Sequence, residues 1–357
     1  ILQGIYRGAK ANNRSLRLFN IEKRASKVLL KKIKKARWEE ANPNSVSKFS
    51  AIAYFYGQQL QEVLNVPVGI IHSSWRGSSV EAWMSAKSLE FYNPNEDFIK
   101  LSGVRPQLTP SQLFNGMIAP IVNYNIKGVL WYQGESNITK PEAYKSLFPS
   151  MVKDWRMLFG NKELPFYYVQ IAPFIYQGNN NYKPTQNSAF MRESQLECEN
   201  LIGNSGMVTT LDIGAKAFIH PPNKKKVADR LLFLALHKTY NFKEVEFQAP
   251  KIKTFKVNNQ TIELFFTNSK TGLYADNELS NFEIAGEDKI FYPAKALIKE
   301  KRYLEVSSTM VSEPVAVRYA FKNWVQGNLY GGNMLPVSSF RTDKWEDAKS
   351  FIEIVQK

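Results

Sequence analysis

The first two-thirds of the chain alternates short apolar runs with longer segments whose apolar residues recur at helical spacing. Short continuous apolar runs are typical of strands buried on both faces, and a 3.6-residue period indicates amphipathic helices. The predicted strands are Ser15–Ile21, Val66–His72, Lys127–Tyr132, Phe166–Ala172 and Met207–Asp212. The predicted helices are Ser50–Leu64, with Ser50 as N-cap, Pro141–Phe159, Gln186–Glu199 and Asn223–Tyr240.

Buried strands that alternate with helices predict a mainly parallel sheet covered by helices on both sides, an α/β fold. After about residue 248 the pattern changes to short alternating segments between turn residues, which favours antiparallel β structure. These segments are Gln260–Thr267, Phe282–Ile284, Leu304–Ser307 and Val315–Phe321. We therefore expect an α/β domain over 1–247, and a smaller β-sandwich-like domain with a C-terminal tail over 248–357.

The net charge of +15 is concentrated at the start of the chain. Residues 1–38 contain twelve Lys or Arg residues and one acid, Glu22, with the densest run at Lys31–Arg37. We interpret this run as a solvated, partly flexible arm, although it could also contact phosphate or another anionic surface. No aromatic residues interleave with it, so nucleic acid is not the expected partner. No apolar run is long enough to predict a membrane span.

Residues that could carry acyl-transfer chemistry follow the predicted strands, where ligands bind in parallel sheets. Gly77 follows the second strand and can offer a backbone N–H, and Gln133, Glu135 and Asn137 follow the third. His220 lies in a loop after the fifth strand. Together they supply a general base and oxyanion donors. Taken singly, such residues are more often ordinary polar residues of a loop or turn, and only their shared place at successive strand ends favours the catalytic interpretation. The single cysteine, Cys198, excludes a zinc site built from several thiolates.

At these residues the chain resembles the sialate O-acetylesterase family, within the SGNH hydrolase superfamily. The resemblance extends from about Arg17 to Trp345 and is most specific at the WYQGESN stretch. The matching stretches are VPVGIIHSSWRGSSVEAWMS (66–85), LFNGMIAPIVNYNIKGVLWYQGESN (113–137), IHPPNKKKVADRL (219–231), PVAVRYAFKN (314–323) and LPVSSFRTDKW (335–345).

The resemblance implies a flavodoxin-like, three-layer α/β/α SGNH domain with an attached antiparallel β domain. It also implies metal-free, cofactor-free removal of O-acetyl groups from sialic acid or other acetylated sugars. Within this scheme Gly77 and Gln133 hold the oxyanion, Glu135 and Asn137 support them, and His220 activates the serine. The family resemblance further suggests a periplasmic or extracellular location, although no signal peptide is visible.

Three departures from the family pattern stand out. No Gly-Gln-Ser-Asn stretch, which carries the family's nucleophile, occurs in the chain, and we expect it and the first strand to lie upstream of Ile1. The position of the orienting acid, two residues before His220, holds Phe218, and Asp212 or Glu135 is a possible substitute. Arg76 stands where the family often has glycine, and it could pair with a substrate carboxylate.

Three functions fit these observations. The chain is the body of an acetylesterase whose serine comes from a preceding segment, a catalytically inactive relative that binds acetylated or acidic glycans, or an anion-binding protein that acts through residues 23–37. The first is the favoured hypothesis.

Overall fold

The computed structural model describes residues 11–92, 104–176, 187–346 and 348–351. The chain divides into two compact units, each built from several stretches of sequence. The first comprises Ile1–Gln170, Glu197–Val208 and Pro222–Val245; the second comprises Ile171–Leu196, Thr209–Pro221 and Glu246–Lys357. Sequence reasoning expected one division at residue 247, whereas the two units interleave along the sequence. No helix in the described ranges is both long and apolar enough to cross a membrane.

Six strands of the first unit form two three-stranded sheets, with the orders β2-β1-β3 and β4-β5-β6. Pairing is parallel between β1 and β3 and throughout the second sheet, while β2 runs antiparallel to β1. The strands are β1 (Asn13–Asn20), β2 (Trp38–Ala41), β3 (Val68–His72), β4 (Val129–Trp131), β5 (Phe166–Val169) and β6 (Ser205–Val208). The mainly parallel pairing agrees with the sequence pattern. The strand expected at Met207–Asp212 lies earlier in the chain than predicted: β6 begins at Ser205 and ends at Val208.

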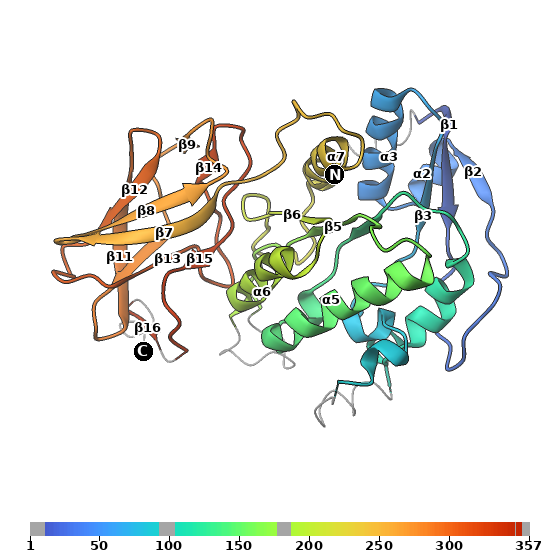
Figure 1. Ribbon diagram of the computed structural model, residues 1–357, viewed down its shortest axis with the longest axis horizontal. Coiled ribbons are helices and arrows are strands. Elements are labelled where there is room, and N and C mark those ends of the chain that lie inside the picture. Colours follow the sequence, from blue (N-terminus) through green and yellow to red (C-terminus); the bar gives the residue numbers. More distant parts are fainter. Residues whose placement is uncertain (1–10, 93–103, 177–186, 347, 352–357) are drawn as a thin grey trace. The chain divides into compact units, whose positions relative to one another are not determined.

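One helical layer covers both sheets. Helices α3 and α7 pack side by side (Figure 1), and α3 also packs on β3 while α7 packs on β5 and β6. Gly57 permits the approach of α3 to β3, since a Cβ atom there would lie 2.7 Å from Cγ1 of Ile70. The helices of the chain are α2 (Pro43–Ser47), α3 (Ala51–Leu64), α5 (Pro141–Leu158), α6 (Ser188–Leu201) and α7 (Lys224–Lys238).

The predicted helices are confirmed within the described residues, although Gln186, where the third was expected to begin, lies outside them. The cap of α3 is also confirmed, because the Ser50 hydroxyl accepts the N–H of Ala53 at 3.3 Å. Helix α5 packs on the second sheet through aromatic rings. Trp131 of β4, for example, stacks on Phe148 with centroids 6.0 Å apart and meets Trp155 edge-on. These rings bury a large apolar area around β4 and β5.

Strands β3 and β4 are only partly buried, in contrast to β5. All four residues of β5 are buried, whereas β3 has none that is fully buried and Gly69 is exposed. In β4, Val129 and Leu130 are also partly exposed. The prediction that Val66–His72 is buried on both faces is therefore wrong for this structure. Among the described residues β3 pairs only with β1, and β4 pairs only with β5, so each has one open edge.

The basic segment before β2 has no helix or strand over residues 21–37, but its backbone is anchored. The N–H of Ser26 donates to the carbonyl of Gln112, and that of Leu30 donates to the carbonyl of Asn115, each at 3.0 Å. The Asn115 side chain returns a hydrogen bond to the Ser26 carbonyl. The chain around Ser26 and Leu30 is thus tied to the body of the first unit. The run Lys31–Arg37 is mostly exposed, and its flexibility stays a prediction.

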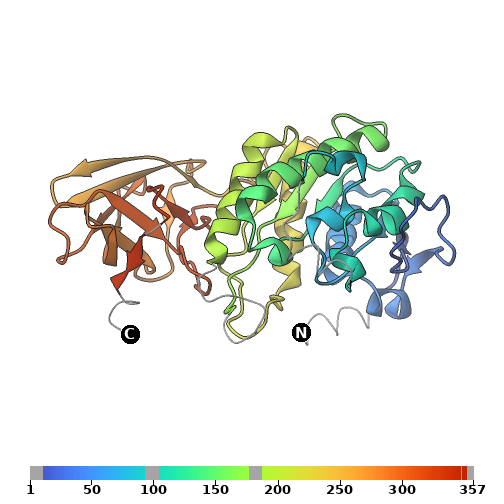
Figure 2. The same ribbon diagram turned by 90° about the horizontal axis from the view of Figure 1, so that it is seen from below.

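The second unit is built mainly from antiparallel strands, as predicted. Figures 1 and 2 show them, orange to red, as a curled sheet, in which seven strands follow the order β15-β13-β10-β11-β12-β8-β7. They surround one apolar core that includes Ile262, Leu304 and Tyr319. The strands are β7 (Lys251–Asn258), β8 (Thr261–Thr267), β9 (Leu273–Tyr274), β10 (Phe282–Ala285), β11 (Ile290–Lys299), β12 (Tyr303–Ser307), β13 (Ala316–Tyr319), β14 (Tyr330–Gly331), β15 (Phe340–Arg341) and β16 (Lys349–Ser350).

A buried arginine explains why the first half of α6 belongs to the second unit. Arg192 is fully buried, and its guanidinium donates to the carbonyls of Lys322 (2.6 Å) and Ala320 (3.2 Å) and to Ser339 Oγ (3.0 Å). The next residue, Glu193, accepts a bidentate pair of hydrogen bonds from the Arg341 guanidinium. Planar guanidinium groups suit such multiple contacts.

We expect Gly116→Ala to destabilise the first unit strongly. A Cβ atom at Gly116 would overlap the Arg24 carbonyl oxygen, and backbone cannot move aside as a flexible side chain can. Overpacking of this kind typically costs about 1–3 kcal/mol. The free energy of unfolding, measured by equilibrium denaturation, should fall by about the upper end of that range. Gly203→Ala is the matched control, because no atom lies within 4 Å of its added Cβ. Equal stabilities of the two variants would contradict the prediction.

Candidate functional site

The loops that follow β3 and β4 meet at the carboxyl ends of these strands. Gln133 Nε2 donates to the Ser78 carbonyl at 3.0 Å, which links the β4 loop to the β3 loop. Gly77 precedes Ser78 in an exposed turn and has φ +71°, a left-handed conformation that favours glycine. The two loops therefore share one rim of the first unit, and Gly77 and Gln133 lie in adjoining loops.

A buried polar network fixes the geometry of this rim. Asn137 Oδ1 accepts hydrogen bonds from Gln133 Nε2 at 2.7 Å and from the Val80 N–H at 3.0 Å. Asn137 Nδ2 donates to Glu81 Oε2 at 2.9 Å. Glu81 is fully buried, and its other oxygen accepts the hydroxyl of Tyr92 at 3.0 Å. Burial and the neighbouring Glu81 carboxylate raise the pKa of Tyr92, so this hydroxyl keeps its proton and remains a donor.

The network uses both amide hydrogens of Gln133. One goes to the Ser78 carbonyl and the other to Asn137. The orientation of Asn137 is fixed by the N–H it accepts and the carboxylate it donates to, so the amide of Gln133 must be the donor in both bonds. The oxyanion role of Gln133 stays a prediction, and it requires one of these hydrogen bonds to be released.

Sequence reasoning missed Glu81, although it holds the network together. Its carboxylate contacts Asn137 and Tyr92, which are 56 and 11 residues away in the chain. A single acid among apolar residues, in Val80-Glu-Ala-Trp83, was the available signal, because a buried carboxylate requires partners.

Glu135 and Lys224 form a second charged feature at the end of β4. Glu135 is half-buried, and burial raises the pKa of its carboxyl group, against the opposing effect of the Lys224 charge. Burial likewise lowers the pKa of Lys224, whose ammonium lies 5.5 Å from the ring centroid of Tyr132. The positive charge of Lys224 thus compensates a carboxylate that the apolar surroundings disfavour.

His220 lies in the second unit, as do Phe218 and Asp212, whereas Gly77 and Gln133 belong to the first. The His220 side chain is exposed, and that of Phe218 is 70% exposed, so the phenyl ring fills no core position. Asp212 is buried. The structure brings together Gln133, Asn137 and the Gly77 turn. The convergence of His220 on the same rim stays a prediction, as does a role for Arg76, which is exposed.

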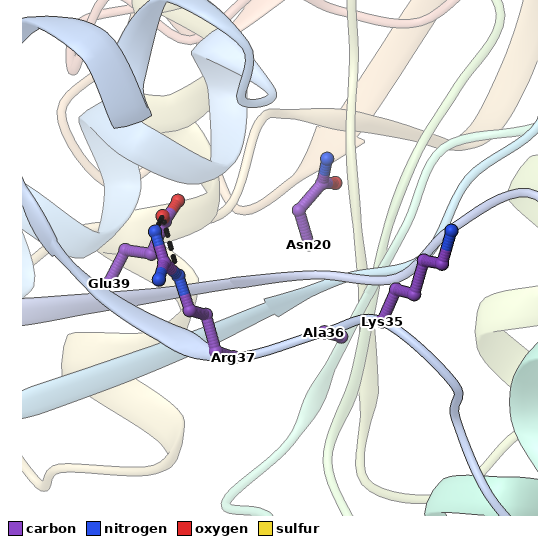
Figure 3. A pocket seen from close by; sticks show the side chains of 5 residues that line it. All are labelled: Asn20, Lys35, Ala36, Arg37 and Glu39. Carbon is purple, nitrogen blue, oxygen red and sulfur yellow. Dashed lines mark hydrogen bonds and ion pairs between the residues drawn. The ribbon is translucent and has the colours of Figure 1, made fainter.

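A hollow of about 480 Å³ lies beside the carboxyl end of β1 and is lined by the basic segment (Figure 3). Its lining residues are Asn20, Lys35, Ala36, Arg37 and Glu39. Arg37 is paired with Glu39 at 3.1 Å, so part of its charge is compensated. The lining of the hollow is polar and includes two cationic side chains, Lys35 and Arg37. The anion-binding hypothesis for residues 23–37 stays a prediction. In the described parts of the chain, no three His, Cys, Asp or Glu side chains are grouped so that they could hold a metal ion.

Comparison with known proteins agrees with this arrangement. The sequence profile of the family described as "carbohydrate esterase, sialic acid-specific acetylesterase" matches residues 18–226. The solved structure of a carbohydrate acetylesterase from Xanthomonas citri is similar, with a TM-score of 0.86 and 35% identity; the match covers 96% of this chain and 76% of that one. The sheets, helical layer and C-terminal antiparallel strands described above thus recur in a carbohydrate esterase.

The sialate O-acetylesterases of Pongo abelii and Homo sapiens are 28% and 27% identical to this chain. Each match covers 77% of this chain and 56% of the relative, so the chain spans little more than half the length of these curated relatives. The profile match covers more than half of the chain and includes both loops of the rim. The chain belongs to the carbohydrate esterase family of sialic acid-specific acetylesterases.

Proposed function

We propose that this chain is the main part of a serine-type esterase that hydrolyses O-acetyl esters on sialic acid or other acetylated sugars. The observation that carries the proposal is the buried network that joins the loops after β3 and β4 and holds the Gly77 turn in place. Oxyanion donors must be fixed before the reaction to stabilise a developing charge, and this network supplies such rigidity. Action on glycans would place the enzyme in the periplasm or outside the cell.

In the proposed reaction a serine from a preceding segment attacks the acetyl carbonyl carbon while His220 removes the serine proton. The backbone N–H of Gly77, together with Gln133 once its amide releases a bond, holds the oxyanion. The bond between the acetyl carbon and the sugar oxygen then breaks as His220 protonates that oxygen, and water hydrolyses the acetyl-serine by the same steps in reverse.

We further infer that the serine-bearing segment adds a parallel strand between β3 and β4. Each of these strands has one open edge in the described part of the chain, and each is less buried than its apolar sequence demands. The same helical layer covers both sheets, and the loops beyond both strands are hydrogen-bonded to one another. An added strand would join the two sheets into one flavodoxin-like sheet and place its own carboxyl end at the rim.

Phe218 supports a second candidate, an inactive relative that binds acetylated glycans without cleaving them. Phenylalanine cannot accept the Nδ1–H bond that orients a catalytic imidazole, and loss of that orienting acid can lower turnover by about 10⁴. The commitment of both Gln133 amide hydrogens points the same way. Binding of acetylated sialic acid with no release of acetate would favour this candidate.

The chain joined to its preceding segment should release acetate from acetylated sialic acid, and His220→Ala should reduce turnover. Removal of a general base typically costs about 10²–10⁴ in rate. Acetate release is measured directly, and Lys216→Ala, an exposed change in the same loop, serves as the control. Turnover of the His220 variant at the parent rate would eliminate the proposed mechanism.

Phe218→Asp should raise turnover if this position orients His220. The side chain is 70% exposed, so the change removes little packing, and a carboxylate there could accept the Nδ1–H of the imidazole. We expect kcat to rise at least about tenfold with little change in KM, because the effect is on chemistry and not on sugar binding. Phe218→Asn separates charge from hydrogen bonding. An unchanged kcat in both variants would show that Phe218 does not occupy the position of the orienting acid.

Amide hydrogen exchange tests the added strand. In the chain joined to its preceding segment, amides of β3 and β4 should exchange more slowly than in residues 1–357 alone, because the new strand covers their open edges. Strand β8, inside the antiparallel sheet of the second unit, is the internal control and should exchange equally in both proteins. Slower exchange throughout both units would indicate general stabilisation, and unaltered β3 and β4 amides would refute an added strand there.

A further inference from the structure

Three polar side chains are hydrogen-bonded in series at the carboxyl ends of β1 and β3. Ser74 Oγ lies 2.7 Å from His72 Nε2, and His72 Nδ1 lies 2.8 Å from Asn20 Oδ1. Asn20 is the last residue of β1, and His72 is its parallel partner at the end of β3. This is the connectivity of a nucleophile, a base and a residue that orients the base, and it lies wholly within the first unit.

The hydrogen-bond partners determine the direction of the series. Because Asn20 Oδ1 is an acceptor, Nδ1 of His72 carries the proton, and Nε2 is left with a lone pair that accepts the hydroxyl proton of Ser74. Burial, and to a lesser extent the charge of Lys23, lowers the pKa of His72, which keeps the imidazole neutral near pH 7. The ring also packs edge-on against Phe49, with centroids 5.2 Å apart, so its orientation is restrained.

The surroundings of Ser74 suit attack on an external ester. Its side chain is exposed, while the base behind it is partly buried. The turn that follows contains Trp75, Arg76 and Gly77, and none of their backbone N–H groups donates to an acceptor among the described residues. Successive N–H groups in a turn with a left-handed glycine are suited to hold an oxyanion.

A purely structural tie between β1 and β3 does not account for Ser74. The parallel ladder already pairs Asn20 with His72, and the Ile21 N–H donates to the His72 carbonyl at 3.0 Å. The Asn20–His72 bond adds to that tie, whereas the exposed Ser74 hydroxyl joins no second element. Among the residues that the structure describes, the imidazole is its only hydrogen-bond partner.

We propose that Ser74 is a nucleophilic serine, activated by His72 and oriented through Asn20, that accepts acyl groups from small carboxylic esters. Ser74 Oγ bonds to the acyl carbon as His72 Nε2 takes the hydroxyl proton. The ester C–O bond then breaks, and the leaving alkoxide receives that proton from His72. Water, activated by the same imidazole, cleaves the acyl-serine to carboxylate and restores Ser74. This activity shares the Gly77 turn with the reaction proposed for His220, but it needs neither His220 nor a serine from another segment.

The test uses the 357-residue chain itself and an alkyl fluorophosphonate, from which a nucleophilic serine displaces fluoride. We expect one phosphonylated serine, mapped by peptide fragmentation to Ser74 in the tryptic peptide that ends at Arg76. Ser74→Ala should abolish labelling at this peptide. His72→Gln should slow labelling at least about 10²-fold, the lower end of what a general base contributes. With 4-nitrophenyl acetate, wild type and variants should follow the same order in nitrophenol release.

Ser73→Ala is the matched control, because the Ser73 hydroxyl is buried next to Ser74 and has no hydrogen-bond partner among the described residues. It should label as fast as the wild type. Asn20→Ala, assayed beside His72→Gln, guards against misfolding, since both variants should keep the circular dichroism of the parent chain while labelling slows. Labelling of Ser73 or a distant serine, no labelling at all, or equal rates in wild type and a folded His72→Gln variant would overturn the proposal. None of these outcomes depends on His220, so the two proposals fail separately.

Discussion

The rim of the first unit depends on one buried carboxylate. Glu81 is removed from solvent, and an ion in such a place is tolerated only when hydrogen bonds replace its lost hydration. Asn137 and Tyr92 supply these bonds, and Asn137 in turn holds Gln133 and the backbone at Val80. A buried polar group of this network that lost its hydrogen-bond partner would destabilise the fold. The two loops therefore behave as a single rigid element.

That rigidity contrasts with the two strands that carry the loops. Within the described parts of the chain, β3 and β4 each pair with one strand only, and most of their apolar residues are partly exposed. Helices α3 and α7 nevertheless pack together across this region, so the helical layer is continuous where the hydrogen-bonded sheet is not. The loop network and the helical layer together hold the open edges in place.

The sequence predicts what is local and loses what depends on distant partners. Helix α3 was foreseen because Ser50 and the apolar spacing lie within a few residues of each other, and the parallel pairing followed from the alternation of runs. The burial of β3 was misjudged because a continuous apolar run predicts a strand with a pairing strand on each side. Among the described strands, β3 pairs with β1 alone. Strand β11 was missed because Pro293 interrupts its pattern, although it pairs with Glu283 of β10.

The site shows the same division. Gly77, Gln133 and Asn137 were identified from their places after predicted strands, and the structure brings their loops together. That Gln133 donates its amide hydrogens to Ser78 and Asn137 could not be known without coordinates. The relation between Asn20 and His72 depends on parallel register across 52 residues, which no spacing along the chain encodes.

The anchoring of the basic segment by Ser26, Leu30 and Gly116 has an electrostatic consequence. A free arm would average its field over many orientations, whereas a segment tied down at Ser26 and Leu30 keeps its cations on one side of the first unit, with Lys35 and Arg37 beside Asn20. A stationary positive field of this kind draws negatively charged molecules from solution toward one side of the first unit and accelerates their diffusional arrival. Dissolved ions shorten the reach of that field to about 8 Å at physiological ionic strength, so the arrival rate of an anion would fall at high salt concentration while that of a neutral molecule would not.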